Sequence, residues 1–183
     1  DGNATIIAAN KLLAAMRKED GTLRTYDEMK AEGIETKYLG RYETNTTPGL
    51  CRLDPNTGIG DPTPAFTYCL NLAEVEVDTK TGKTTVLKFT CVDFVGRIGN
   101  IDAVNGQAYS GIMHGIGFAL KEDYADVKKH ANMFGAGTSY IKDVPDDINL
   151  IHIDGAISDG PFGSSGASEA FQASGHCAVL NGI

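Results

Sequence analysis

One stretch of the sequence, residues 96–122, has the apolar spacing of a helix and yet is rich in glycine. One helix face is marked by Ile101, Val104, Ala108 and Ile112. The same stretch contains Gly106, Gly111, Gly115 and Gly117. Each glycine inside a helix costs about 1 kcal/mol relative to alanine, so several of them need a reason. Close approach of another backbone is one explanation and close approach of a bulky ligand is the other; the sequence leaves both open.

Helical patterns are also found near both ends of the chain. A stripe that ends before Asp20 is formed by Ile6, Ala9, Leu13 and Met16. Thr25 and Glu28 have the spacing of a capping box, which predicts a second, short helix. Residues 41–64 hold Pro and Gly at many positions and are predicted to be a loop. A last helix is predicted from Glu169 to Leu180.

Two strand patterns joined by a tight turn predict a β-hairpin. Residues 65–78 form the first strand and residues 84–94 the second, with Gly82 in the turn. The apolar residues of the first strand change face near Leu72, which predicts a bulge there or a strand that changes its environment. A further short strand is predicted at residues 150–153. Together these elements predict an α+β fold, in which the hairpin and further strands pack against helices.

Size and charge exclude several classes of function. The 183 residues are enough for one domain, or are a piece of a larger one. The net charge of −8 disfavours nucleic acid and anionic membranes as partners. No apolar run approaches the ~18 residues that cross a bilayer and no leader opens the chain, so we expect a cytoplasmic protein. The first residue is Asp1 and the last, Ile183, stands in an apolar run, so we expect a fragment.

Neither the cysteines nor the histidines show the spacing of a metal site. Successive cysteines are 18, 22 and 86 residues apart, without the C-x-x-C pattern of zinc or iron–sulfur sites. We therefore expect reduced, mostly buried thiols. The four histidines contain no pair at i, i+4 and no H-E-x-x-H motif. A metal ion held by protein side chains is not expected.

Asn100 and Gln107 are candidates for ligand binding on the glycine-bearing helix. Asn100 stands at the N-cap position, and the free N–H groups beyond it could take a phosphate. Gln107 lies two turns further along the same face and could reach a polar group of a ligand. An exposed or internally bonded glutamine is the more frequent finding, so this role stays open.

A second candidate region is the loop of small residues from Gly160 to Ser168. Consecutive N–H groups in such a loop could converge on an anion just before the last helix. Glu169 then falls in the first turn of that helix, where the dipole stabilises its charge and a purely structural role explains it. Backed by Phe162 and Phe171, it could instead be a desolvated base with a raised pKa. The sequence does not separate these two roles.

Several short motifs follow one another in order along residues 65–180. They are AEVEVD at 73–78, TG at 81–82, VDFVG at 92–96, Asn100, GQ at 106–107, Gly111, HGIGFALKE at 114–122 and SGASE at 165–169. This ordered set resembles the molybdopterin-binding part of the xanthine oxidase family of molybdenum hydroxylases. Within that family it is most similar to the aldehyde oxidoreductases of sulfate-reducing bacteria. Family members often carry Pro, Gly and Gln where this chain has Asp102, Ser110 and His114.

The resemblance implies a cofactor, molybdopterin cytosine dinucleotide with molybdenum, whose metal is held through the pterin and not by a protein side chain. Glu169 would be the catalytic base in the oxidation of aldehydes to carboxylic acids, with water as the oxygen source. The cofactor-binding residues that the resemblance implies are Asn100, Ala103, Val104, Gln107, Ser164, Ser165, Gly166, Ala167 and Ser168.

The resemblance also implies that residues 1–183 are the C-terminal portion of a molybdopterin-binding domain in a larger enzyme. Its partners would be the aldehyde substrate and the remaining domains of the same enzyme, which carry the iron–sulfur clusters; a homodimer stays open. The isolated residues should then not oxidise aldehydes. An alternative from a different class is a cofactor-free structural or assembly module that packs through its glycine-bearing helix.

Overall fold

The computed structural model describes residues 2–43, 53–60, 66–157 and 160–183. The chain divides into two compact units, and each is described by itself. Unit 1 comprises residues 1–65 and 158–162, and unit 2 comprises residues 66–157 and 163–183. Within the described ranges, no helix combines the length and the apolar character that a bilayer crossing requires.

Unit 1 contains two helices, α1 (Gly2–Met16) and α2 (Tyr26–Ala31). Both predicted helices are confirmed, but the predicted apolar face of α1 is only partly correct. Leu13 is 41% exposed, whereas its neighbour Leu12 is half-buried. The described part of the predicted loop, residues 41–43 and 53–60, contains no helix or strand, and the rest of that loop lies outside the described residues.

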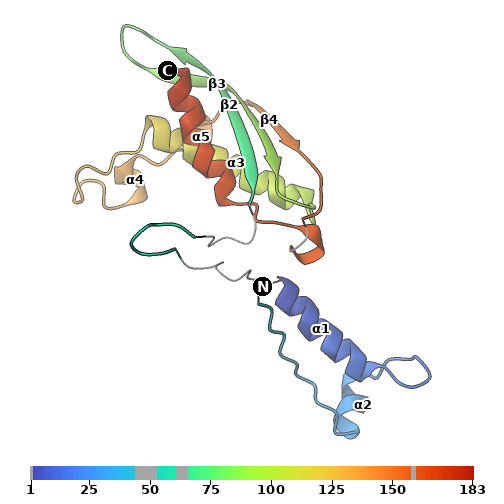
Figure 1. The fold of residues 1–183 in the computed structure, drawn as a ribbon. Helices are drawn as coiled ribbons and strands as arrows, with labels where there is room; N and C mark the ends of the chain where they lie inside the picture. Colours follow the sequence, from blue (N-terminus) through green and yellow to red (C-terminus); the bar gives the residue numbers. More distant parts are fainter. Residues whose placement is uncertain (1, 44–52, 61–65, 158–159) are drawn as a thin grey trace. The chain divides into compact units, whose positions relative to one another are not determined.

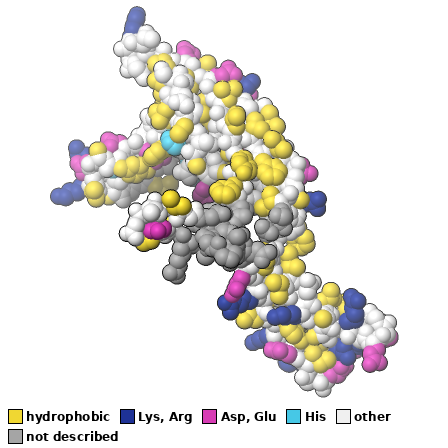
Figure 2. Space-filling view, viewed as in Figure 1, with side chains coloured by type: hydrophobic (Ala, Val, Ile, Leu, Met, Phe, Trp, Pro, Cys, Tyr) yellow, Lys and Arg dark blue, Asp and Glu magenta, His cyan; other side chains and the backbone are white. Residues whose placement is uncertain are grey.

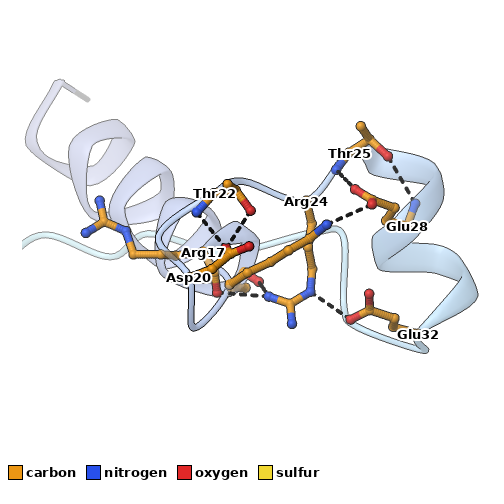
Figure 3. A network of polar contacts seen from close by, with 9 residues as sticks. Arg17, Asp20, Thr22, Arg24, Thr25, Glu28 and Glu32 are labelled. Carbon is orange, nitrogen blue, oxygen red and sulfur yellow. Dashed lines mark hydrogen bonds and ion pairs between the residues drawn. The ribbon is translucent and has the colours of Figure 1, made fainter.

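The predicted capping box begins α2 (Figure 3). The Thr25 N–H donates to Glu28 Oε2 at 2.7 Å, and the Glu28 N–H donates to Thr25 Oγ1 at 3.2 Å. Lys18 Nζ donates to Glu28 Oε1 at 2.8 Å. These donors, with Lys18 as the largest cause, lower the pKa of Glu28 to about 2 because they favour the charged carboxylate. The local sequence pattern therefore accounts for the start of this helix.

Unit 2 is built around a three-stranded sheet in the order β2-β3-β4 (Figure 1). Its strands are β2 (Tyr68–Val77), β3 (Thr84–Phe94) and β4 (Asp147–His152). β2 and β3 are antiparallel, which confirms the predicted hairpin, and β4 joins β3 in parallel. A parallel neighbour requires a long crossover, and here the crossover contains the glycine-bearing helix.

The hairpin contains a bulge, close to the predicted position but not at it. The register shifts between Glu74 and Val75, because Glu74 pairs with Lys88 and Val75 pairs with Val86. Leu87 on β3 is the extra residue, so β2 itself keeps an unbroken alternation of exposed and half-buried residues. The apolar residues before the bulge are exposed on the outer face of the sheet, namely Tyr68, Leu70 and Leu72. Hydrophobic side chains reach the surface over this unit (Figure 2).

Two long helices, α3 (Ile101–Leu120) and α5 (Glu169–Gly182), lie against one face of the sheet (Figure 1). The short elements α4 (Met133–Ala136) and η1 (Ile141–Asp143) connect α3 to β4, and η2 (Pro161–Gly163) precedes α5. This arrangement confirms the α+β fold class. The core between sheet and helices contains Val86, Phe89, Cys91, Val95, Val104, Ala108, Ile112, Ile116, Phe171 and Val179.

The glycines of α3 do not all have the same explanation. A Cβ atom at Gly111 would stand 2.9 Å from the backbone nitrogen of Gln172, and one at Gly115 would stand 3.0 Å from that of His176. These two glycines therefore allow α3 to approach the backbone of α5. Gly106 is different, because a Cβ atom there would have no heavy atom within 4 Å among the described residues. Helix packing explains Gly111 and Gly115 but not Gly106.

Candidate functional site

The two predicted binding segments meet in unit 2, where the loop before α5 is hydrogen-bonded to the turn before α3. Gly96 and Ser164 form an isolated β-bridge. The Ser165 N–H donates to the Val95 carbonyl at 2.8 Å, and the Arg97 N–H donates to the Gly163 carbonyl at 2.9 Å. Residues 163–165 therefore lie directly beside the start of α3, although some 60 residues separate them in the sequence.

Gly96 makes this close contact possible. Its φ of +75° lies in the left-handed region that favours glycine. A Cβ atom at this position would stand 2.5 Å from the Gly163 carbonyl oxygen and 2.8 Å from the Ser165 nitrogen. Both the conformation and the space exclude a larger residue.

Side chains of the loop add further bonds. Ser164 Oγ donates to the Arg97 carbonyl at 2.6 Å. Thr67 Oγ1 lies 3.1 Å from Ser165 Oγ and donates to the Gly166 carbonyl at 2.7 Å. The side chains of Ser164 and Ser165 are thus used inside the protein, so a ligand would meet mainly the backbone of this loop. Thr67, which the sequence did not single out, holds the loop from the segment just before β2.

Some of the residues predicted at the start of α3 are used inside the protein, and others are exposed. The Asn100 side chain accepts the Ala103 N–H at 3.0 Å and so caps the helix, as predicted. Val104 is only 9% exposed and belongs to the core, so its side chain cannot line a site. Ala103 and Gln107 are exposed one turn apart, with Gly106 beside them. The face open to a ligand is therefore formed by Ala103, Gly106 and Gln107.

Free N–H groups remain in the loop before α5. Among the described residues, none accepts a hydrogen bond from the backbone N–H of Gly166, Ala167 or Ser168. Ser168 occupies the N-cap position of α5, but its side chain makes no capping bond. Three consecutive donors at a helix start suit an anion such as a phosphate group.

Glu169 follows these donors in the first turn of α5. Its side chain is exposed, and within the described ranges its carboxylate makes no hydrogen bond or ion pair. Phe171 is fully buried in the core of unit 2, whereas Phe162 belongs to unit 1, so the apolar surroundings of Glu169 stay a prediction. The absence of a capping bond leaves only the helix dipole for a structural role.

A shallow groove of about 230 Å³ opens next to this carboxylate. On α5 it is lined by Glu169, Gln172, Ala173 and His176. Phe118 of α3 closes the other side, with its ring edge-on to the imidazole of His176 at 5.2 Å between ring centres. The groove combines the apolar side chains of Phe118 and Ala173 with the polar side chains of Glu169, Gln172 and His176.

The sequence missed a buried polar network between the sheet and α3. His152 Nδ1 lies 2.7 Å from Asp93 Oδ2, and His152 Nε2 lies 2.7 Å from Asn105 Oδ1. Burial raises the pKa of Asp93, against the hydrogen bond and the charge of His152. One signal could have found it, because Asp93 is in phase with Phe89 and Cys91 on the buried face of β3.

The cysteines agree only in part with the prediction of buried, reduced thiols. Cys69, Cys91 and Cys177 are free, and Cys51 lies outside the described residues. Cys91 is buried and Cys69 half-buried, with 3.4 Å between the two sulfur atoms, whereas Cys177 is exposed. The thiol of Cys91 lowers the pKa of Cys69 to about 7 by hydrogen bonding. In the part of the chain that the structure describes, no three His, Cys, Asp or Glu side chains could hold a metal ion together.

Comparison with known proteins decides the family. The family described as molybdopterin cofactor-binding domain matches residues 1–145. The chain belongs to this family. It is 42% identical over 182 residues to an aldehyde oxidoreductase of Megalodesulfovibrio gigas. The aligned region covers 100% of this chain and 20% of that protein. The resemblance to the xanthine oxidase family is thereby confirmed.

Solved structures show the same similarity in three dimensions. The aldehyde oxidoreductase of Desulfovibrio desulfuricans matches with a TM-score of 0.86 and 42% identity, over 98% of this chain and 19% of that one. The aldehyde oxidoreductase of Desulfovibrio gigas matches with a TM-score of 0.88 and 40% identity, over the same shares. The chain therefore spans about one fifth of the length of these relatives.

Proposed function

We propose that the protein is part of a molybdenum-dependent aldehyde oxidoreductase, which oxidises aldehydes to carboxylic acids with water as the oxygen source. The observation that carries this proposal is the 42% identity over 182 residues to a protein named aldehyde oxidoreductase. The remaining domains of the full-length protein would complete the site and carry the iron–sulfur clusters. On this proposal residues 1–183 alone do not turn over aldehydes.

The residues present fit a pterin cofactor with a pyrophosphate-linked nucleotide. Gly106 leaves open space on the exposed face of α3, and the N–H groups of residues 166–168 have no partner within the described ranges. We propose that this face, with Ala103 and Gln107, and the backbone of the loop from Ser164 to Ser168 hold molybdopterin cytosine dinucleotide. Asn100 and Val104 would contribute indirectly, the first by capping α3 and the second by anchoring it in the core.

Glu169 is proposed to be the catalytic base. When bound, the cofactor supplies the two-electron redox chemistry, and its molybdenum is held through the pterin. The carboxylate of Glu169 makes no bond within the described part of the chain, so its oxygen atoms are free to accept a proton. The groove beside it, lined by Phe118 and Ala173 together with Gln172 and His176, leaves room for a small organic substrate. Walls from the rest of the enzyme would then supply the desolvation that a base needs.

The glycine-bearing helix no longer supports the alternative of a cofactor-free structural module. Its glycine-bearing helix was expected to pack against a partner, but Gly111 and Gly115 face α5 of the same chain. No outside helix is needed to explain these glycines.

The experiment that tests the proposal uses the full-length protein. Molybdenum and iron are measured by elemental analysis, the nucleotide is released by acid hydrolysis, and aldehyde oxidation is followed with a dye acceptor. We expect stoichiometric molybdenum, release of cytidine monophosphate and turnover. Correctly folded full-length protein without molybdenum would overturn the enzyme assignment, and molybdenum without a cytosine nucleotide would overturn only the cofactor form.

A further inference from the structure

The polar network of Asp93, His152 and Asn105 joins three elements of unit 2. Asp93 stands on β3, His152 on the neighbouring β4, and Asn105 on α3. Both contacts of the imidazole are 2.7 Å long. Asp93 is 1% exposed and the His152 side chain is 11% exposed, so water hardly competes for these bonds. The network is therefore a direct link from the sheet to α3.

The hydrogen-bonding chemistry of Asp93, His152 and Asn105 requires the imidazole to keep both of its partners. A charged His152 donates its Nδ1–H to Asp93 and its Nε2–H to Asn105. A neutral His152 keeps both bonds only if Asp93 carries the proton or if the Asn105 amide is turned over. In every one of these states the imidazole has a polar partner on each side. Releasing Asn105 would leave one nitrogen of a nearly buried ring unpaired, which is costly.

The position of Asn105 connects this link to the proposed cofactor face. Asn105 lies between Val104, which points into the core, and the exposed residues Gly106 and Gln107. Gly111, where a Cβ atom would meet the backbone of α5, comes more than one turn later. In the first two turns of α3, the side-chain bond to the sheet comes from Asn105. Together with the burial of Val104 and Ala108 in the core, this bond sets the rotation of the helix about its own axis at that point.

We infer that Asp93 and His152 are positioning residues for the cofactor-binding face of α3, which they hold through Asn105. The inference rests on the proposed function, since it concerns how that site is kept in shape. Neither Asp93 nor His152 touches the exposed face of α3; they act through the amide of Asn105. The carboxylate orients the imidazole, and the imidazole sets the direction in which Gln107 is presented.

The test uses the full-length protein and four variants of the network. Asn105→Ala removes the tether and leaves the Asp93–His152 pair intact, while His152→Gln removes the ring. The double variant of these two tests whether they act through one link. Asp93→Asn keeps a hydrogen-bonded chain, because its amide can donate to Nδ1 while Nε2–H still donates to Asn105. Asn149→Ala is the matched control, since Asn149 is exposed on the same strand as His152.

Two measurements are made on each preparation. Molybdenum retained per chain is followed during long dialysis, and hydrogen–deuterium exchange is followed in peptides that cover residues 101–108. We expect Asn105→Ala and His152→Gln to lose molybdenum about tenfold faster than the parent, the scale found for outer partners of a metal site. We also expect faster exchange in residues 101–108, and a double variant no worse than His152→Gln alone. Asp93→Asn and Asn149→Ala should match the parent.

Several results would overturn the inference. One is parent-like molybdenum retention and exchange in both Asn105→Ala and His152→Gln. Another is additive losses in the double variant, which would mean that the two residues act separately. A third is an Asp93→Asn variant as impaired as His152→Gln, since the bonded chain would then not be what matters. A parent protein without molybdenum would instead defeat the proposed function, and the exchange measurement would still test the tether.

Discussion

Gly111 and Phe171 lie so close together that a methyl group on Gly111 would stand 2.5 Å from the Cβ atom of Phe171. Phe171 is fully buried and cannot move aside without disturbing the core. We therefore expect Gly111→Val to lower the free energy of unfolding by about 1–3 kcal/mol, as overpacking does. Denaturant unfolding measured on the full-length protein and on the variant checks this. An unchanged unfolding midpoint would mean that α3 and α5 are not packed in this way.

Gly106 provides the opposite case on the same helix. A Cβ atom there meets no described residue within 4 Å, so Gly106→Ala should raise helix stability by up to about 1 kcal/mol in the protein without cofactor. If the face beside Gln107 holds the pterin, the same methyl group should reduce the molybdenum content. Unfolding of the cofactor-free protein and metal analysis of the isolated protein test the two halves. Normal metal content would show that the cofactor does not approach this glycine.

Gly96 is expected to control the loop before α5. Gly96→Ala would combine a strained φ of +75° with a contact of 2.5 Å to the Gly163 carbonyl oxygen. The loop should detach from the turn before α3, and cofactor binding should be lost while the hairpin remains. Limited proteolysis at residues 160–168 together with metal analysis is the measurement. Gly82→Ala is a suitable control, because its φ of +73° is similar but its surroundings are empty; it should keep the metal.

Local sequence patterns predicted most of the secondary structure, and they failed where a distant partner decides the outcome. The capping box of Thr25 and Glu28 is confirmed because its two bonds close within one turn. The exposed position of Leu70 and Leu72 was not predicted, since an alternating strand does not reveal which face a helix covers. The bulge was placed near Leu72, but the extra residue is Leu87 on the other strand.

The candidate site likewise combines features that local sequence predicts with contacts that depend on residues far away in the sequence. Its two segments were chosen from their glycines, small residues and helix starts, but the bridge between Gly96 and Ser164 that joins them depends on tertiary structure. The network of His152, which stands in the strand predicted at residues 150–153, was missed because its partners Asp93 and Asn105 lie 59 and 47 residues away. Neither relation has a short-range sequence signature.

Asp93 predicts a particular dependence of stability on pH. Burial raises its pKa in the folded protein above the ordinary value of 3.8, so the folded state holds this proton more tightly than the unfolded state. The stabilising effect is complete below pH 3.8 and is lost as the pH rises through the pKa of the folded state. Unfolding of the parent and of Asp93→Asn is compared from pH 4 upwards. The parent should lose stability relative to the variant as the pH rises, and the opposite trend would show that His152 outweighs burial.

Glu169→Gln separates the catalytic role of Glu169 from a role in the helix dipole. The amide has nearly the same shape, and the metal is held through the pterin, so fold and molybdenum content should remain. Loss of a general base should lower aldehyde turnover by about 10² to 10⁴. Asp102→Asn is the matched control, because Asp102 is the exposed first-turn carboxylate of α3; a change of this kind costs about 0.3–1 kcal/mol of stability and should spare turnover. Molybdenum content, melting temperature and turnover are measured on one preparation of each variant. A Glu169→Gln variant that keeps both its metal and its turnover would remove Glu169 from the catalytic machinery.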